Sequence, residues 1–239
     1  PLREEDDFKL NVKALSAEIT EDIDMLIICN PNNPTSSQIT SDIMRRILDI
    51  CLVKGVFVLV DETYIEFAKE REKVTSVPLT VSYNNLLVLR GVSKFFAAPG
   101  LRLGYGICGN PDLLKEIGQR KDPWSVSSIA ALAGELMFSD QDYIEKTRTL
   151  ICSERARILG ILHTFTGCKA YPASANFVLV RILKEGVTAQ DIFEACIRKG
   201  LMIRNCSTFP FLDASYIRFC FMSPEKNDEL LAILGSYLA

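Results

Sequence analysis

Two apolar runs joined by a helical stretch constrain the fold of this chain most strongly. Residues 24–29 form a short apolar run typical of a buried strand, and residues 56–60 form a second run without a polar break. Residues 39–54 carry apolar side chains near helical spacing, and Gly55 follows them as a helix stop. This order predicts a βαβ unit with parallel strands and a right-handed crossover. An unbroken run such as 56–60 also predicts a strand covered on both faces.

The rest of the chain predicts two domains. We expect residues 1–139 to form part of a large α/β domain with a mostly parallel sheet. Residues 140–239 are expected to form a long connecting helix and a small C-terminal α+β domain, in which Thr188 and Asp191 are spaced as a capping box. The further expected elements are strands at 86–89, 103–108, 177–181, 201–204 and 216–221, and helices at 111–119, 127–138, 140–165, 188–199 and from Ser223 onward.

Composition excludes several classes of function. The chain has 239 residues, 48% of them hydrophobic and 24% charged, and its net charge of −3 comes without a basic stripe. A nucleic-acid partner is therefore not expected. No apolar run approaches the roughly 20 residues that span a bilayer, so no membrane partner is expected either. The acidic start at residues 1–7 does not have the pattern of a signal peptide.

Eight cysteines occur singly, and no two of them form a Cys-x-x-Cys pair. This pattern is typical of buried thiols in a reducing compartment, so we expect a cytoplasmic protein without disulfides. His163 is the only histidine, which argues against a metal site and against a serine-type catalytic triad.

Polar residues follow three of the predicted strands where each strand ends. Asn33 lies in an Asn-Pro turn, Asp61 ends the second apolar run, and Lys94 follows the third, with Arg102 farther along. Ligands of open α/β sheets bind at the carboxyl ends of strands. A lysine there can hold a phosphorylated aldehyde as a Schiff base, and an arginine can bind its phosphate. The alternatives are a plain turn at Asn33, a helix cap at Asp61 and a solvated surface charge at Lys94.

Three motifs around these residues resemble those of a known enzyme family. They are Asn-Pro-Asn-Asn-Pro-Thr at 30–35, Asp-Glu-Thr-Tyr at 61–64, and the lysine segment from Ser93 to Arg102. In this order they resemble the fold-type I pyridoxal-phosphate enzymes, the aspartate aminotransferase superfamily, over essentially the whole chain. The resemblance implies the mostly parallel sheet of the pyridoxal-phosphate transferase large domain, here incomplete, and a homodimer. It implies a cofactor site of Asn33, Asp61, Tyr64, Ser93, Lys94 and Arg102, with Lys94, Asp61 and Tyr64 catalytic.

The resemblance also implies a role for these residues. Lys94 would bind pyridoxal 5'-phosphate as a Schiff base, and Asp61 would pair with the protonated pyridine nitrogen, which makes the ring an electron sink. Asn33 would bond the ring hydroxyl, which Tyr64 could also reach. Arg102 would bind the cofactor phosphate.

The chain departs from the family pattern in three places. Gly91 stands where many members have a hydroxyl residue that binds the cofactor phosphate, and Ser93 and Arg90 are the nearest residues that could compensate. Ser36 replaces the glycine of the Asn-Pro turn. The Gly-rich phosphate cradle and the stacking aromatic residue of the family are not found, so we expect the chain to be the carboxyl-terminal two-thirds of such an enzyme.

Two arginines in the second domain point to a branch of the family. Arg204 and Arg218 resemble the arginines that bind the substrate's phosphate and carboxylate in histidinol-phosphate aminotransferase and threonine-phosphate decarboxylase. The alternative is a pair of surface arginines at a strand edge. We expect an aminotransferase of amino-acid biosynthesis acting on a small anionic amino substrate, an amino acid or an amino-phosphate. A threonine-phosphate decarboxylase and a non-catalytic, cofactor-less binding domain remain as alternatives.

Overall fold

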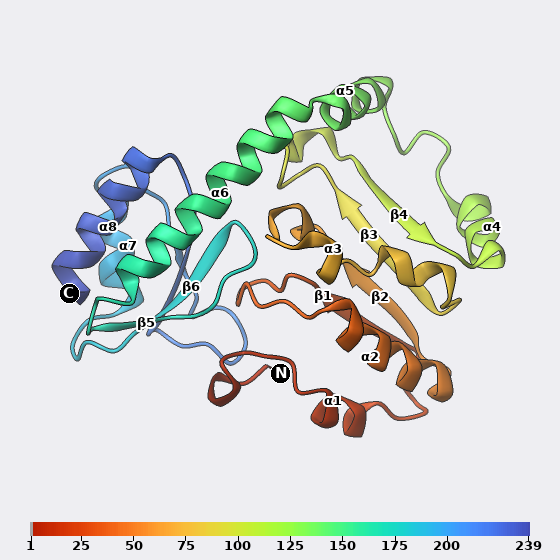
Figure 1. Ribbon diagram of the computed structural model, residues 1–239, viewed down its shortest axis with the longest axis horizontal. Helices are drawn as coiled ribbons and strands as arrows, with labels where there is room; N and C mark the ends of the chain where they lie inside the picture. Colours follow the sequence, from red (N-terminus) through yellow and green to blue (C-terminus); the bar gives the residue numbers. More distant parts are fainter. Residues whose placement is uncertain (1) are drawn as a thin grey trace. The chain divides into compact units, whose positions relative to one another are not determined.

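The computed structural model describes residues 2–239, which divide into two compact units. The first contains Leu2–Asn32 and Gln38–Glu145, and the second contains Asn33–Ser37 and Lys146–Ala239. Each unit has a four-stranded sheet of its own (Figure 1).

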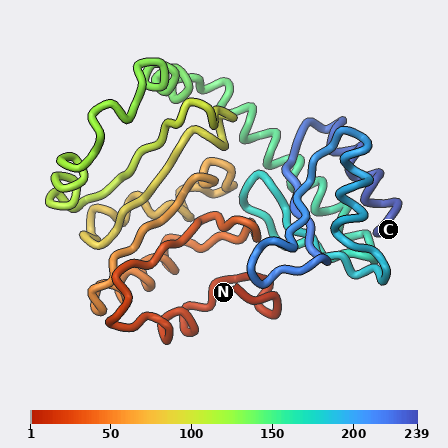
Figure 2. Tube along the Cα trace, turned by 180° about the vertical axis from the view of Figure 1, so that it is seen from behind, coloured from red at the N-terminus to blue at the C-terminus, as the bar shows by residue number. Residues whose placement is uncertain are grey.

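The sheet of the first unit follows the predicted βαβ logic. Its strands are β1 (Met25–Cys29), β2 (Phe57–Asp61), β3 (Leu86–Gly91) and β4 (Gly104–Cys108), in the order β1-β2-β3-β4. Strands β1, β2 and β3 are parallel, and β4 runs antiparallel to β3. In the view from behind, the strands follow one another across the sheet in chain order (Figure 2). The predicted α/β class with a mostly parallel sheet is confirmed.

Helix α2 (Ser41–Lys54) forms the crossover between β1 and β2. The side chain of Thr40 accepts a hydrogen bond from the Ile43 N–H and so caps its start, and Gly55 ends it with a φ of 72°, which favours glycine. Its apolar stripe packs on one face of the sheet, and burial of each large aliphatic side chain there contributes about 1.5–3 kcal/mol. The fully buried members of this core include Met44, Ile47, Leu48, Cys51, Val58, Val60, Leu86 and Val88.

The opposite face of this sheet is less covered than the sequence predicts. Phe57 and Leu59 of β2 are only half-buried, and Met25 and Ile27 of β1 are 47% and 64% exposed. The prediction that β2 is covered on both faces is therefore wrong for the described residues. The physical reason is that α2 covers the face of alternate residues such as Val58, and no element of the described chain buries the other set to the same extent.

The remaining elements of the first unit connect and flank these strands. The sequence did not predict α1 (Val12–Glu18) or α3 (Arg71–Val74), which are too short for a clear helical period. The expected helices at 111–119 and 127–138 are present as α4 (Pro111–Arg120) and α5 (Ser128–Ser139). The 3₁₀ helices are η1 (Glu4–Asp6), η2 (Ile65–Phe67), η3 (Val77–Val81) and η4 (Pro99–Leu101).

The second unit is an α+β domain with an antiparallel sheet. Its strands are β5 (Cys168–Ala170), β6 (Phe177–Ile182), β7 (Arg204–Asn205) and β8 (Tyr216–Cys220), in the order β5-β6-β8-β7. The sequence did not predict β5. Its helices are α6 (Gln141–Leu162), which begins in the first unit, α7 (Ala189–Ile197) and α8 (Pro224–Leu238). The capping box of Thr188 and Asp191 is confirmed at the start of α7.

The expected strand at 201–204 is wrong. Only Arg204 and Asn205 pair with β8, whereas Leu201 and Ile203 are buried in the connection that follows α7. The Leu201 N–H donates to the Cys196 carbonyl of α7, so this apolar stretch ends the helix and connects it to β7.

No helix in residues 2–239 is both long and apolar enough to cross a membrane. The same residues contain no group of three or more histidine, cysteine, aspartate or glutamate side chains arranged to hold a metal ion.

Candidate functional site

The parallel register of the first sheet determines where the predicted strand-end residues lie. Cys29 of β1 pairs with Asp61 of β2, and Asp61 pairs with Leu89 of β3, so the three strands end at the same edge. Asp61 is the last residue of β2, and Lys94 follows the end of β3 after a short turn. The topology therefore brings these two side chains to one edge of one sheet.

Asp61 has one carboxylate oxygen engaged and one open. Its Oδ1 accepts hydrogen bonds from the Thr63 N–H at 2.9 Å and from the Thr63 hydroxyl, while its Oδ2 accepts none from residues 2–239. Tyr64, not Asp61, is the N-cap residue of η2. Burial and the negative charge of Asp61 together raise the pKa of the neighbouring Cys29 thiol. The half-buried carboxylate is therefore oriented by its own loop, with one oxygen left for a cationic partner.

Lys94 lies on a turn that its neighbours hold in place. Phe95 is buried against Phe67, with 5.2 Å between ring centroids, and the Tyr143 hydroxyl donates to the Phe95 carbonyl at 2.8 Å. Lys94 itself is exposed, and its Nζ lies 6.0 Å from the centroid of the Tyr64 ring. Its ammonium forms no ion pair within the part of the chain that the structure describes. The turn thus presents an amine that no carboxylate of residues 2–239 neutralises.

Ser93 and Arg102 lie near the two ends of the loop that joins β3 to β4. Among the described residues, the Ser93 hydroxyl has no hydrogen-bond partner. Arg102 is exposed, and its Nη1 donates to the Pro99 carbonyl at 2.9 Å, which turns part of the guanidinium back onto its own loop. The other guanidinium nitrogens of Arg102 have no partner in residues 2–239 and can bind an anion.

The glycine at position 91 has a packing reason. Gly91 of β3 pairs with Gly104 of β4, and a Cβ at Gly91 would lie 3.3 Å from the Leu103 carbonyl oxygen. A Cβ at Gly104 would lie 3.0 Å from the Arg90 carbonyl oxygen. The two strands therefore approach more closely here than side chains at both positions would permit.

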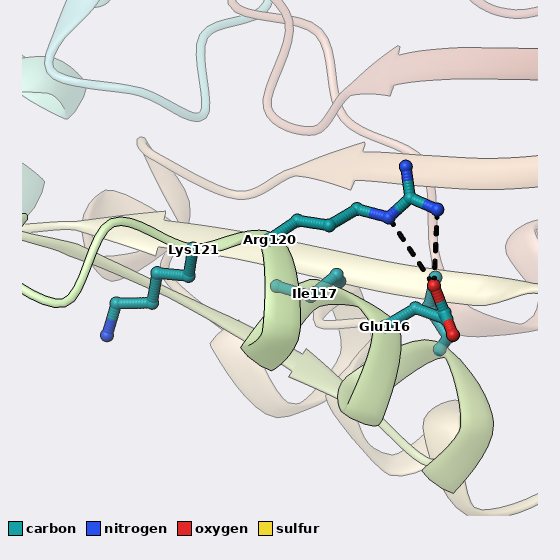
Figure 3. A pocket seen from close by; sticks show the side chains of 5 residues that line it. Glu116, Ile117, Arg120 and Lys121 are labelled. Carbon is teal, nitrogen blue, oxygen red and sulfur yellow. Dashed lines mark hydrogen bonds and ion pairs between the residues drawn. The ribbon is translucent and has the colours of Figure 1, made fainter.

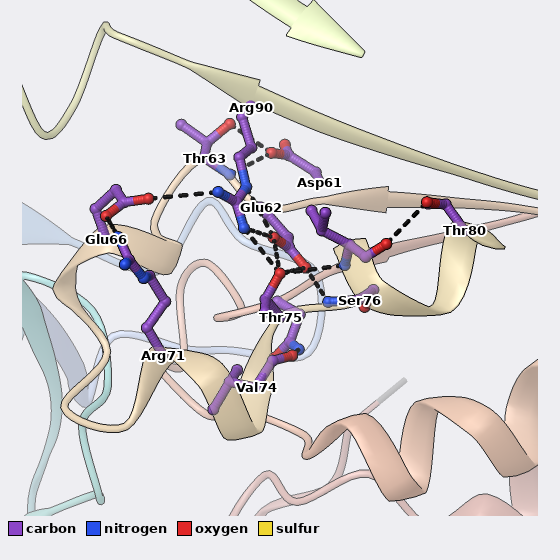
Figure 4. Close-up of polar contacts among 12 residues, drawn as sticks. Asp61, Glu62, Thr63, Glu66, Arg71, Val74, Thr75, Ser76, Thr80 and Arg90 are labelled. Carbon is purple, nitrogen blue, oxygen red and sulfur yellow. Dashed lines mark hydrogen bonds and ion pairs between the residues drawn. The ribbon is translucent and has the colours of Figure 1, made fainter. Parts of the chain in front are cut away.

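Arg90 cannot compensate for the missing hydroxyl, because it belongs to a buried network (Figure 4). Its Nε and Nη2 donate to Glu62 Oε2 at 3.0 and 2.8 Å, and the Glu62 side chain is fully buried. Thr75 and Ser76 also donate to Glu62. Burial opposes the Arg90 charge, but the hydrogen bonds and charge of Glu62 prevail and raise the pKa of Arg90. Sequence reasoning missed this pair, although an acid after β2 and an arginine near the end of β3 were its signals.

Asn33 lies in the second unit, with Arg218. Its Oδ1 accepts a hydrogen bond from Arg218 Nη1, and its Nδ2 has no partner among residues 2–239. The earlier asparagine of the motif, Asn30, has a structural role instead and is buried. Its Nδ2 donates to the Ile39 and Val74 carbonyls, and its Oδ1 accepts from the Ile39 N–H. Asn33, Arg204 and Arg218 thus belong to one unit, and Asp61, Tyr64, Ser93, Lys94 and Arg102 belong to the other.

Arg204 and Arg218 lie directly opposite each other in the β7–β8 ladder. Both guanidinium carbons lie over the Phe209 ring, at 5.4 and 5.9 Å from its centroid. Arg204 also donates to the Thr208 hydroxyl at 2.8 Å. Burial raises the pKa of the Cys206 thiol to about 11, while the charges of both arginines act in the opposite direction. Neither arginine has a carboxylate partner within residues 2–239.

A groove of about 680 Å³ opens beside these two arginines. Its lining residues are Gln190, Phe193, Met202, Ile203, Arg204, Asn205, Ser207, Thr208, Arg218, Phe219 and Cys220. Like charges held opposite each other in a sheet repel, so this groove suits an anion.

A second hollow, of about 590 Å³, lies beside α4 (Figure 3). It is lined by Leu113, Glu116, Ile117, Arg120 and Lys121 and contains none of the predicted site residues. Its one ion pair, between Arg120 and Glu116, is exposed to solvent. We therefore do not regard it as the functional site.

Comparison with known proteins identifies relatives for the whole chain. The family model of aminotransferase class I and II matches residues 1–234. A provisionally named threonine-phosphate decarboxylase of Caldanaerobacter subterraneus is 38% identical over 237 residues, which cover 99% of this chain and 64% of that protein. Histidinol-phosphate aminotransferase of Methanopyrus kandleri is 31% identical, with 97% of this chain and 57% of that protein covered. The chain thus spans less than two thirds of the length of these relatives.

A solved structure confirms the similarity of fold. Histidinol-phosphate aminotransferase from Clostridium acetobutylicum superposes with a TM-score of 0.90 at 30% identity, covering 98% of this chain and 69% of that one.

Proposed function

Because the chain belongs to the aminotransferase class I and II family, we propose that it forms part of a pyridoxal-phosphate-dependent aminotransferase. The proposed substrate is a small amino acid or amino-phosphate. The family depends on pyridoxal 5'-phosphate. The observation that carries the proposal is Lys94, an exposed amine without an acidic partner among the described residues, at the sheet edge where β2 ends in Asp61.

The residues present fit the cofactor. Asp61 has an open Oδ2 that can accept the pyridinium proton, and its Oδ1 bonds to Thr63 keep the carboxylate in place. Lys94 Nζ is the amine that would hold the aldehyde, with the Tyr64 ring beside it. The open donors of Ser93 and Arg102 would bind the phosphate. When bound, the cofactor withdraws electrons from the bonds at the substrate's α-carbon.

Other residues of the chain would orient the ligands. Asn33 Oδ1 is occupied by Arg218, so its Nδ2 is the group left to donate to the cofactor's ring hydroxyl, together with Tyr64. We propose that Arg218 binds the substrate's carboxylate and Arg204 its phosphate, since guanidinium groups bind both with paired hydrogen bonds. Once the substrate displaces it, the Lys94 amine can move a proton at the α-carbon.

The test uses this chain and free pyridoxal phosphate. A visible absorbance band should appear on mixing, and borohydride should bleach it. Mass spectrometry of the reduced protein should then find the cofactor on the Lys94 peptide, and Lys94→Ala should show neither result. Lys121, an exposed lysine in the α4 hollow, gives the matched control Lys121→Ala. A wild-type chain without the band and without the adduct would favour the cofactor-less binding domain.

A threonine-phosphate decarboxylase is the second candidate, favoured by the 38% identity to the Caldanaerobacter relative. Analysis of the products formed from threonine phosphate and from histidinol phosphate separates the decarboxylase from the aminotransferase. Released carbon dioxide indicates a decarboxylase, whereas a keto product and an aminated cofactor indicate an aminotransferase.

We further propose a cytoplasmic homodimer. Eight free cysteines support a reducing compartment. Helix α5 supports self-association, because it is strongly apolar and yet Ile129, Leu132 and Leu136 are 74%, 60% and 65% exposed. We propose residues 1–139 as part of the large cofactor domain and 140–239 as the connecting helix and small domain. Light scattering on the purified chain measures the oligomeric state directly.

A further inference from the structure

The two arginines of the groove share a single aromatic ring. Arg204 and Arg218 come from neighbouring strands, and their guanidinium carbons lie 5.4 and 5.9 Å from the centroid of Phe209. Arg218 has a second ring, Phe177, at 4.9 Å, whereas Phe209 is the only one of these rings that contacts both arginines.

The loop that carries Phe209 is held by its own backbone. The Phe209 N–H donates to the carbonyl of the buried Cys206 at 2.9 Å, and the Leu212 N–H donates to the Phe209 carbonyl at 3.2 Å. The preceding residue, Thr208, accepts a hydrogen bond from Arg204. The ring is therefore presented to the arginines from a turn of defined shape.

An aromatic ring does what a carboxylate could not do at this position. The face of a ring attracts a guanidinium through its quadrupole without cancelling its charge. A carboxylate between the arginines would neutralise them and compete with an incoming anion. Phe209 thus offsets part of the repulsion between the two cations while both stay available to a ligand.

We propose that Phe209 is a positioning residue, which holds Arg204 and Arg218 together as a two-arginine receptor for the anionic group of the substrate. The proposal rests on the anion-binding role given to the arginines in the proposed function. It adds that the affinity of the receptor depends on an aromatic face at position 209.

The first measurement is made on the wild-type chain without any ligand. In a spectrum of the arginine Nε–H groups, the resonances of Arg204 and Arg218 should be displaced by the ring current of Phe209. Phe209→Leu should return the Arg204 resonance toward its ordinary value and move the Arg218 resonance only in part, because the Phe177 ring still lies 4.9 Å from Arg218. Phe209→Trp should keep both resonances displaced. An Arg204 resonance at its ordinary value in the wild-type chain would overturn the proposal whatever the variants do.

The second measurement is a titration with inorganic phosphate. The two exposed cation–π contacts set an upper limit of about tenfold on the affinity that held arginines can gain, so Phe209→Leu should bind phosphate more weakly, by up to about tenfold. Phe209→Trp should bind like the wild type. The matched control is Phe211→Leu, because Phe211 lies on the same loop and is 78% exposed. Position 211 has a positive φ, which phenylalanine and leucine there tolerate equally, so the substitution adds no backbone strain of its own.

The outcomes separate this inference from the proposed function. If Arg204→Met loses phosphate binding but Phe209→Leu does not, the receptor stands and the role of Phe209 is wrong. If the wild-type chain binds no phosphate, or binds it as well with Arg204→Met and Arg218→Met, the receptor itself is wrong and Phe209 has nothing to position. If Phe209→Leu melts at a lower temperature than the wild type, its weaker phosphate binding is not used as evidence. The role of Phe209 is then decided by the phosphate affinity of the folded Phe209→Trp variant and by the wild-type arginine resonances.

Discussion

Replacement of Arg90 by methionine tests the buried network that lies beside Asp61. Methionine keeps most of the apolar length of the side chain but removes the two donors that Arg90 supplies to Glu62. The Arg90 side chain is 16% exposed and the Glu62 side chain 0%, so the variant leaves a carboxylate buried without its cation. Loss of one partner of such a pair costs about 3–5 kcal/mol. Thr75 and Ser76 still donate to Glu62, so we expect the lower end, about 3 kcal/mol.

The assay is urea unfolding of the 239-residue chain, followed by circular dichroism. In a thermal melt the same loss lowers the Tm by roughly 6–12 °C for a chain of this size. The matched control is Arg120→Met, which breaks the exposed pair with Glu116 and should cost about 0–1 kcal/mol. The double variant Glu62→Gln/Arg90→Met should recover much of the lost stability, because no buried charge remains. Equal losses for Arg90→Met and Arg120→Met would refute the reasoning.

Three further results are expected. Asp61→Asn should retain bound pyridoxal phosphate but turn over more slowly than wild type, because an amide cannot hold the pyridinium proton; equal rates would remove Asp61 from catalysis. Gly91→Ser should lower the free energy of unfolding, since its Cβ would lie 3.3 Å from the Leu103 carbonyl oxygen, and a urea midpoint equal to the wild type would contradict this. Hydrogen bonds from Thr188 lower the pKa of Asp191, so their stabilisation is present above the ordinary aspartate pKa and is lost as the pH falls through the lowered one. Thr188→Ala should therefore reduce the Tm at neutral pH, and this difference should shrink in acid.

Most of the fold follows from local patterns that a reader can find in the sequence. The βαβ unit is confirmed because apolar period, a capping threonine at 40 and a stop glycine at 55 all specify the same helix. The capping box at Thr188 is confirmed for the same reason. The expected strand at 201–204 is wrong because an apolar stretch of that length fits a buried connection equally well.

The candidate site divides in the same way. The sequence by itself determined which residue types follow each strand. The order of Asp61 and Lys94 along the chain was enough to identify the family. Only the tertiary structure decided their surroundings: that Arg90 is bound to Glu62, that Asp61 keeps one oxygen open, and that Arg204 and Arg218 meet over Phe209. The physical reason is distance along the chain. Hydrogen bonds and charge pairs depend on ångström separations between residues far apart in sequence, and only sheet register and packing set those separations.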